Sequence, residues 1–321
     1  MKIHAQWFVI GWVFLTGCMD TEATDPGAGS EKIPIQFNLG LKTEVLPFPT
    51  LRSIPDFAIP EPAVPGAEPD TPPDADDGSD LSGLCTQVDY LVYKAGEADT
   101  PFKCKQFNLA DADTDFGIVY DSLPAGPYRF VFIAHSSEES ELAEQILQVD
   151  EVSDTFFASE EKEISFSGEN GASDIALRRT VCRIECVSTE PVPADLKDFE
   201  IRIERYPAGL HTGNGLGATA SDIQAFLHTF SAEEAGQLSF THAFYTFIPP
   251  DKGTIDLYLR ARNREGKVMR ERKITGVTPL SNRIIRYSGR LYTPSASDDT
   301  FRLDVYEGGK WESVEEVVLP D

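Results

Sequence analysis

The sequence predicts a mainly β protein built from β-sandwich domains, and three observations lead to this prediction. Aromatic residues reach 10% of the chain, with 20 Phe and 10 Tyr, and these residue types favour strands. The 22 Pro and 24 Gly supply turns and interrupt long helices. Short alternating apolar runs recur between turn signals, which is typical of sandwiches. A length of 321 residues predicts about two domains.

The N-terminal segment predicts export and lipid attachment. Residues 1–17 combine a basic residue near the start with an apolar run over 7–15, which is too short to span a membrane. The sequence then matches the lipobox of bacterial lipoproteins, Leu15-Thr16-Gly17-Cys18, whose cysteine receives the lipid. We therefore expect a signal peptide over 1–17, a tether over 18–31, and acyl chains such as palmitate on Cys18. More than one chain is needed for stable anchoring.

Residues 32–189 are expected to form the first sandwich domain. Its first strand is indicated by the alternation of Ile33, Ile35, Phe37 and Leu39. Residues 47–80 interrupt this domain with nine prolines and a run of acidic residues. This composition cannot form a core strand or helix, so we expect an extended, solvated loop.

The remaining elements of the first domain follow from apolar runs between turns. Strands are expected over residues 88–92, 102–109, 117–120, 129–134, 164–166 and 175–187. A short helix is expected over 137–149, because Leu142, Ile146 and Val149 would share one side of it.

A second sandwich domain is expected over residues 197–321, after a linker over 190–196 that contains two prolines. A capping box begins at Ser221, and the apolar residues that follow it have helical spacing, so a short helix is predicted over 221–230. Strands are expected over residues 199–203, 240–248, 255–261, 267–274, 283–292 and 301–306.

Four cysteines follow the lipobox, in a compartment that permits disulfides. Cys182 and Cys186 lie four residues apart in a predicted strand, which separates their Cα atoms by about 13 Å, too far for a bridge. We expect them to be small core residues. Cys85 and Cys104 are left open, because their positions allow a bridge between strands but do not require one.

Composition and motifs argue against several functions. A net charge of −25 repels phosphate backbones, so nucleic acid is not expected as a partner. The histidines and cysteines lack zinc-site spacing. Residues 213–218 match a nominal dinucleotide fingerprint, but no parallel βαβ unit surrounds them, so a flexible loop is expected. We therefore predict no metal, no cofactor and no enzymatic activity.

Four stretches carry a resemblance to a known family. They are Val88-Asp89-Tyr90-Leu91-Val92-Tyr93, Leu123-Pro124-Ala125-Gly126-Pro127-Tyr128, Leu177-Arg178-Arg179-Thr180-Val181-Cys182-Arg183-Ile184 and Asn282-Arg283-Ile284-Ile285-Arg286-Tyr287-Ser288-Gly289-Arg290-Leu291-Tyr292. Over most of residues 31–321 the sequence resembles the FimB-like, fimbrillin-associated anchor and accessory subunits of type V pili.

The resemblance implies two tandem transthyretin-like β-sandwich domains in a fimbrial subunit that serves surface attachment. It implies a location at the outer surface of the outer membrane, with other fimbrial subunits as partners. It also implies assembly by β-strand complementation, in which an extended segment of one subunit completes the sheet of its neighbour.

Two sites in the chain bear on this assembly. In polymerising subunits of such pili a protease cuts after an Arg and removes the first strand, and Arg52-Ser53 lies just beyond the predicted strand here. Cleavage would make a stalk-like subunit and retention an anchor; we favour retention. At the other end of the chain, an apolar tail is either a donor strand for a neighbour or a strand of its own domain. Its apolar residues are Val314, Val317, Val318 and Leu319.

One rival interpretation belongs to another class of protein. A surface lipoprotein could bind a glycan or a host protein without polymerising, through an aromatic platform. Trp311, Tyr206 and Tyr245 are the candidate platform residues, although each of these residue types is more often found in a core or an interface.

Overall fold

A computed structural model describes residues 31–42, 48, 81–96, 100–111, 115–167, 171–218, 223–295 and 300–307, with the backbone of 21–22. Nearly all regular structure in these ranges is β-strand, which confirms the predicted fold class. The helical segments within them are two 3-10 turns, η1 (Leu81–Gly83) and η2 (Pro250–Lys252). No helix in the described part of the chain has the length and apolar character needed to cross a membrane.

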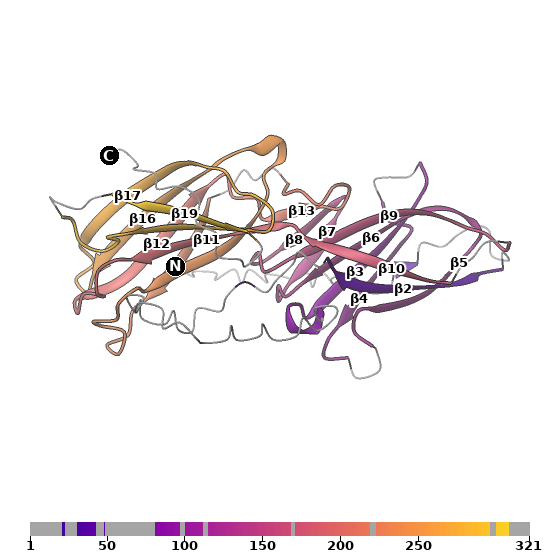
Figure 1. Cartoon of the computed structure of the whole chain (residues 1–321), viewed down its shortest axis with the longest axis horizontal. Coiled ribbons are helices and arrows are strands. Elements are labelled where there is room, and N and C mark those ends of the chain that lie inside the picture. Colours follow the sequence, from indigo (N-terminus) through magenta and orange to yellow (C-terminus); the bar gives the residue numbers. More distant parts are fainter. Residues whose placement is uncertain are drawn as a thin grey trace, which may run out of the picture.

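Eight strands form the first sandwich, which lies at one end of the long axis in Figure 1. Its strand order is β1-β4-β3-β6-β9-β10-β2-β5, and only the β2–β10 pair is parallel. The strands are β1 (Thr21–Glu22), β2 (Ile33–Leu41), β3 (Gln87–Lys94), β4 (Lys103–Asn108), β5 (Ile118–Leu123), β6 (Gly126–His135), β9 (Phe156–Ile164) and β10 (Ala172–Arg179).

The first sandwich has two layers because β9 and β10 share only two register pairs, at Arg178 and Arg179. Beyond this short contact, β10 leaves β9 and pairs with β2, so that β10, β2 and β5 cover the face of β3, β6 and β9. The two layers share one apolar core. Strands β3 and β6 are buried on both faces, and this explains why they read as nearly continuous apolar runs in the sequence.

The second sandwich occupies the other end of the long axis (Figure 1). It consists of two four-stranded sheets, β15-β11-β18-β19 and β14-β12-β16-β17, whose facing sides form a second core. The strands are β11 (Val181–Ser188), β12 (Leu196–Glu204), β14 (Gln224–Thr229), β15 (Thr241–Phe247), β16 (Ile255–Asn263), β17 (Val268–Val277), β18 (Arg283–Gly289) and β19 (Arg302–Glu307).

A small sheet joins the two sandwiches. Its strands are β7 (Ser140–Ala143), β8 (Ile146–Val149) and β13 (Gly209–His211), in the order β13-β8-β7. Figure 1 shows these strands between the two ends of the molecule. Strand β8 comes from the first half of the sequence and β13 from the second, so the pairing ties the halves together through main-chain hydrogen bonds.

Sheet membership changes at Thr180, between β10 and β11. Strand β11 pairs with β15 and β18 in the second sandwich, so the residues predicted as a linker, 190–196, follow β11 and lead into β12. The chain therefore passes from the first sandwich to the second within an almost continuous extended segment. The division into two independently folding domains stays a prediction.

Arg179, the last residue of β10, is fully buried at this change of sandwich. Its guanidinium donates two hydrogen bonds to the Asp154 carboxylate, at 2.7 and 2.8 Å, and one to Asn282 Oδ1 at 2.7 Å. Burial raises the pKa of the Asp154 carboxyl, whereas Arg179 acts to lower it. The two hydrogen bonds from the Arg179 guanidinium therefore offset the desolvation of the Asp154 carboxylate.

The two predicted helices are wrong. The segment predicted over 137–149 is the β7–β8 hairpin, with Glu144 in the left-handed region at φ 55°. The segment predicted over 221–230 contains β14, which pairs with β12 and packs Phe226 on Phe244 with ring centroids 5.0 Å apart. In both places pairing with a distant strand overrides the local helical spacing of apolar residues.

The described cysteines are buried. Cys182 and Cys186 are buried core residues, as predicted, and they lie in the second sandwich, where burial raises the pKa of each thiol to about 12. The open alternative for Cys85 and Cys104 is resolved against a bridge, because the two side chains belong to different apolar clusters.

A buried histidine in the second core makes stability depend on pH. His242 packs on Phe199, and its Nε2 lies 3.1 Å from the Tyr292 hydroxyl. Burial, assisted by neighbouring His228, lowers the pKa of His242 to about 3, well below the value of about 6.5 expected in the unfolded chain. The unfolded state therefore binds the proton first, and stability that is fully present above pH 6.5 is lost as the pH falls.

We expect the free energy of unfolding to fall by up to about 1.4 kcal/mol per pH unit between pH 6 and 4 through this group. Substituting His242→Gln should make that slope shallower, whereas the control His211→Gln, in β13 and outside this aromatic cluster, should keep it. Urea unfolding followed by circular dichroism at pH 7.5, 6 and 5 measures the slopes. Equal slopes in the wild type and the His242 variant would show that this residue is not the source.

Candidate functional site: the N-terminal strand and its groove

Strand β2 is the first strand with described side chains, and it lies between two other strands. It pairs in parallel with β10, from Gln36 opposite Ala172 to Leu41 opposite Leu177. On its other side it pairs antiparallel with β5, from Ile33 opposite Leu123 to Asn38 opposite Ile118. Pro34, which lacks an N–H group, lies before the parallel ladder with β10 begins. An N-terminal segment thus occupies an interior position in its sheet.

One face of β2 supplies side chains to the first core. Ile33, Ile35, Phe37 and Leu41 are buried, as the alternation in the sequence predicts for all but Leu41. The ring of Phe37 is fully buried, with centroids 4.8 Å from Phe130 and 5.1 Å from Phe132. Burying four such side chains is worth about 6–12 kcal/mol before the entropy cost of ordering the segment. Without β2, the walls β10 and β5 would border an apolar groove.

Strand β5, one wall of this groove, is held by side chains as well as by β2. The Asp121 carboxylate of β5 accepts hydrogen bonds from Lys103 Nζ of β4 at 2.6 Å and from the Tyr90 hydroxyl of β3 at 3.0 Å. The side chain of Asp121 is only 2% exposed, so this ion pair between β4 and β5 is shielded from solvent. It ties β5 to the opposite layer through contacts that do not involve β2.

The other wall, β10, is fixed at its end by Arg179 and by the continuation of the chain into β11. A loop of the second half also contacts this region, since Arg178 donates to the Asn214 carbonyl at 3.1 Å and Thr180 donates to the Gly215 carbonyl. Gly215 has φ +71°, and an added Cβ would lie 2.6 Å from Phe157. The segment 213–218, expected to be a flexible loop, therefore packs closely where β10 ends.

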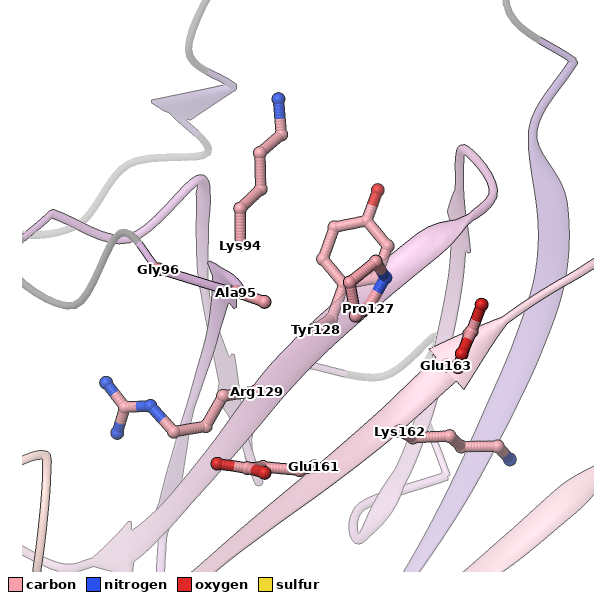
Figure 2. A pocket seen from close by; sticks show the side chains of 9 residues that line it. All are labelled: Lys94, Ala95, Gly96, Pro127, Tyr128, Arg129, Glu161, Lys162 and Glu163. Atoms are coloured by element: carbon pink, nitrogen blue, oxygen red, sulfur yellow. The ribbon is translucent and has the colours of Figure 1, made fainter.

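A shallow hollow lies at the end of the first sandwich, where β3, β6 and β9 meet. Figure 2 shows its side chains pointing apart: Lys94 and Tyr128 to one side, Arg129 and Glu161 to another, and Lys162 to a third. The cations also have partners, since Lys94 lies 4.2 Å from the Phe102 ring centroid and Lys162 donates to Ser173 at 2.7 Å. This arrangement does not converge on a ligand.

The residues predicted to carry the function lie outside the described part of the chain. These are Cys18 for lipidation, Arg52 and Ser53 for processing, and the tail residues Val314, Val317, Val318 and Leu319. The sequence did not single out Asp121 or Lys103, because a buried ion pair between distant strands leaves no local pattern. No group of three or more His, Cys, Asp or Glu side chains among the described residues is placed to hold a metal.

Two of the three residues that the rival interpretation needs do not form an exposed platform. Tyr206 is buried, and its hydroxyl donates to the Tyr245 carbonyl at 2.8 Å. Tyr245 is itself half-buried and stacks on Phe48 with ring centroids 6.1 Å apart. Both residues therefore have a structural role, and Trp311 lies outside the described residues.

A family model matches residues 70–293, more than half of the chain, and describes fimbrillin-A associated anchor proteins Mfa1 and Mfa2. No curated protein matches the sequence.

Solved structures of similar fold include two candidate adhesins from Bacteroides ovatus, both with a TM-score of 0.50. One is 14% identical, over 81% of this chain and 87% of that protein; the other is 10% identical, over 88% and 96%. The fimbrial anchor protein Mfa2 from Porphyromonas gingivalis is 10% identical over 87% of this chain and 98% of its own, with a TM-score of 0.49. At these identities the likeness concerns the fold alone.

Proposed function

The chain belongs to the family of fimbrillin-A associated anchor proteins, which is not an enzyme family, and we propose that it is a lipid-anchored fimbrial subunit that keeps its own N-terminal strand. In this role it moors a fimbria to the outer surface of the outer membrane, and its partners are other fimbrial subunits. Acyl chains on Cys18 supply the attachment, and the tether over 18–31 separates the lipid from the first sandwich.

The observation that carries the proposal is the interior position of β2. A strand that has main-chain partners on both sides and fills the core with Phe37 completes its own sheet. While β2 stays in place, the position between β10 and β5 is not open to a neighbour's strand, which suits a subunit at the end of a fibre. Retention of β2 requires that the chain is not cut at Arg52, or that a cut does not release the strand.

We also propose that the groove between β10 and β5 can take part in strand complementation. Because Asp121 holds β5 by side-chain contacts and Arg179 holds the end of β10, both walls have support that does not depend on β2. A subunit of this architecture can accept an extended segment in place of β2. The apolar tail of residues 314–319 is one candidate donor toward a neighbouring subunit, and pairing within its own sheet is the alternative.

Lipidation is tested by Cys18→Ala in the native organism, with Met19→Ala as the matched neighbour control. We expect the Cys18 variant to leave the outer-membrane fraction and its cells to shed fimbriae into the medium, whereas the control stays attached. Membrane fractionation, palmitate labelling and electron microscopy of surface filaments provide the readouts. A Cys18 variant that stays in the membrane with normal filaments would contradict the proposed anchoring.

A further inference from the structure

Phe48, which follows the end of β2 by seven residues, is buried against the second sandwich rather than the first. Its side chain is 6% exposed and clusters with Ile284 and Tyr306, while its ring stacks on Tyr245. The residues next to this contact surface along the strands, such as Ile184, Phe244 and Ile285, point the other way and belong to the core of the second sandwich. Phe48 therefore packs on the opposite, outward face of the sheet β15-β11-β18-β19.

The strand register explains why this face offers a place for an aromatic ring. Tyr245 of β15 lies opposite Arg183 of β11, Arg183 lies opposite Ile284 of β18, and Ile284 lies opposite Tyr306 of β19. These four residues form one row across all four strands. Together with Arg179 they make up what we term the Phe48 socket.

Arg179 covers the socket from the side of the first sandwich. Its guanidinium carbon lies 3.9 Å from the centroid of the Phe48 ring, a close cation–π contact. The guanidinium is held in this position by Asp154 and Asn282. Because Arg179 is the last residue of β10, the strand that forms a wall of the β2 groove also supplies the cover of the socket.

The groove that holds β2 and the Phe48 socket bind consecutive parts of the same N-terminal segment. Paired positions of β2 and β10 differ by a constant 136 residues, as in Asn38 and Asp174. The same offset, counted from Phe48, gives position 184, the residue after Arg183 of the socket row. Since β2 and β10 run parallel and β10 is followed by β11 of the second sandwich, the end of β2 also points toward the second sandwich, where Phe48 is buried.

We propose that the Phe48 socket is a second binding site for the segment that carries β2, and that it retains this segment even when the chain behind it is cut. The inference rests on the proposed function, because it concerns the strand that an anchor keeps.

The socket also sets a specificity requirement for any incoming strand. A donor strand that displaces β2 fills both the groove and the socket only if it carries an aromatic or large aliphatic side chain at the right position. That position lies seven residues after the donor residue that takes the place of Leu41.

The effect of the socket should appear in the dissociation rate of the N-terminal segment. Burying a phenylalanine side chain corresponds to about a tenfold to hundredfold change in an equilibrium constant. Interface changes of this kind act mainly on dissociation. Removing the Phe48 ring is therefore expected to speed release of the segment by at least about tenfold.

The test uses the full-length chain with residues 62–68 replaced by the recognition sequence of a site-specific protease. After cutting, size-exclusion chromatography and mass spectrometry follow the fraction of N-terminal fragment that stays bound over time. Phe48→Ala removes the ring from the fragment without changing either sandwich. Phe48→Leu keeps a large apolar side chain, and Glu31→Ala changes an exposed residue just before β2 in the same fragment.

We expect the wild-type and Glu31→Ala fragments to stay bound, Phe48→Ala to leave at least about tenfold faster, and Phe48→Leu to leave at a rate between them. If Phe48→Ala leaves as slowly as the wild type while β2 stays bound, the socket inference is overturned and the proposed function stands. If every fragment, wild type included, leaves as soon as the chain is cut, retention of β2 itself fails and the inference fails with it.

Discussion

Replacing Phe37 with alanine is expected to lower the free energy of unfolding by about 3–5 kcal/mol. The ring is fully buried between Phe130 and Phe132, so its removal loses apolar burial and leaves a cavity that the two aromatic neighbours fill only in part. Urea unfolding followed by circular dichroism measures the change. This loss is a large fraction of the total stability of a typical protein domain.

The matched control is Gln36→Ala, one residue earlier on the opposite face of β2. Gln36 donates one hydrogen bond to Asn38 at 2.9 Å, so its loss should cost about 0.5–1.5 kcal/mol. Similar unfolding midpoints for Phe37→Ala and the wild type would mean that β2 does not complete the first core. That result would remove the basis for a retained strand.

The second large effect is expected at the ion pair of Arg179 and Asp154, which lies where the chain passes from the first sandwich to the second. Arg179→Met should destabilise the protein by about 3–5 kcal/mol at pH 7.5, because it leaves the Asp154 carboxylate buried without its cation. The double variant Arg179→Met with Asp154→Leu removes both charges, and it should be more stable than the single variant. Denaturant unfolding of the wild type and the three variants, including Asp154→Leu alone, forms a complete double-mutant cycle.

The pH dependence of the Arg179 variant follows from the sign of the Asp154 shift. Burial already raises the pKa of this carboxyl, and without Arg179 only the weaker effect of Arg183 lowers it. A folded-state pKa above the unfolded value favours the native state when the group is protonated, and this stability is lost as the pH rises through the folded value. Arg179→Met should therefore be less destabilised at pH 5 than at pH 7.5. An equal loss at both pH values would show that Asp154 is not the residue left uncompensated.

The strands of the first sandwich were predictable where their residues alternate. Ile33, Ile35 and Phe37 show the period of two that a half-buried strand requires, and β2 begins at Ile33 as expected. Cys182 and Cys186 were correctly assigned to a core because their spacing along a strand excludes a bridge. These inferences needed only local spacing and the geometry of a strand.

What could not be predicted depends on contacts between residues far apart in the sequence. The parallel pairing of β2 with β10 joins positions 136 residues apart, and nothing local to Ile33–Leu41 specifies it. The ion pairs of Asp121 and Arg179 join residues 18 and 25 positions apart, which is also beyond the reach of a local pattern. The same limit explains the two wrong helices, since β8 and β14 have apolar spacing that fits a helix but pair with the remote strands β13 and β12.

The most direct test of a retained N-terminal strand is mass analysis of the protein purified from its native outer membrane. The account predicts a mature chain that begins at an acylated Cys18 and still contains both β2 and Phe48. A mature chain that begins at Ser53, with no N-terminal fragment bound to it, would contradict the account.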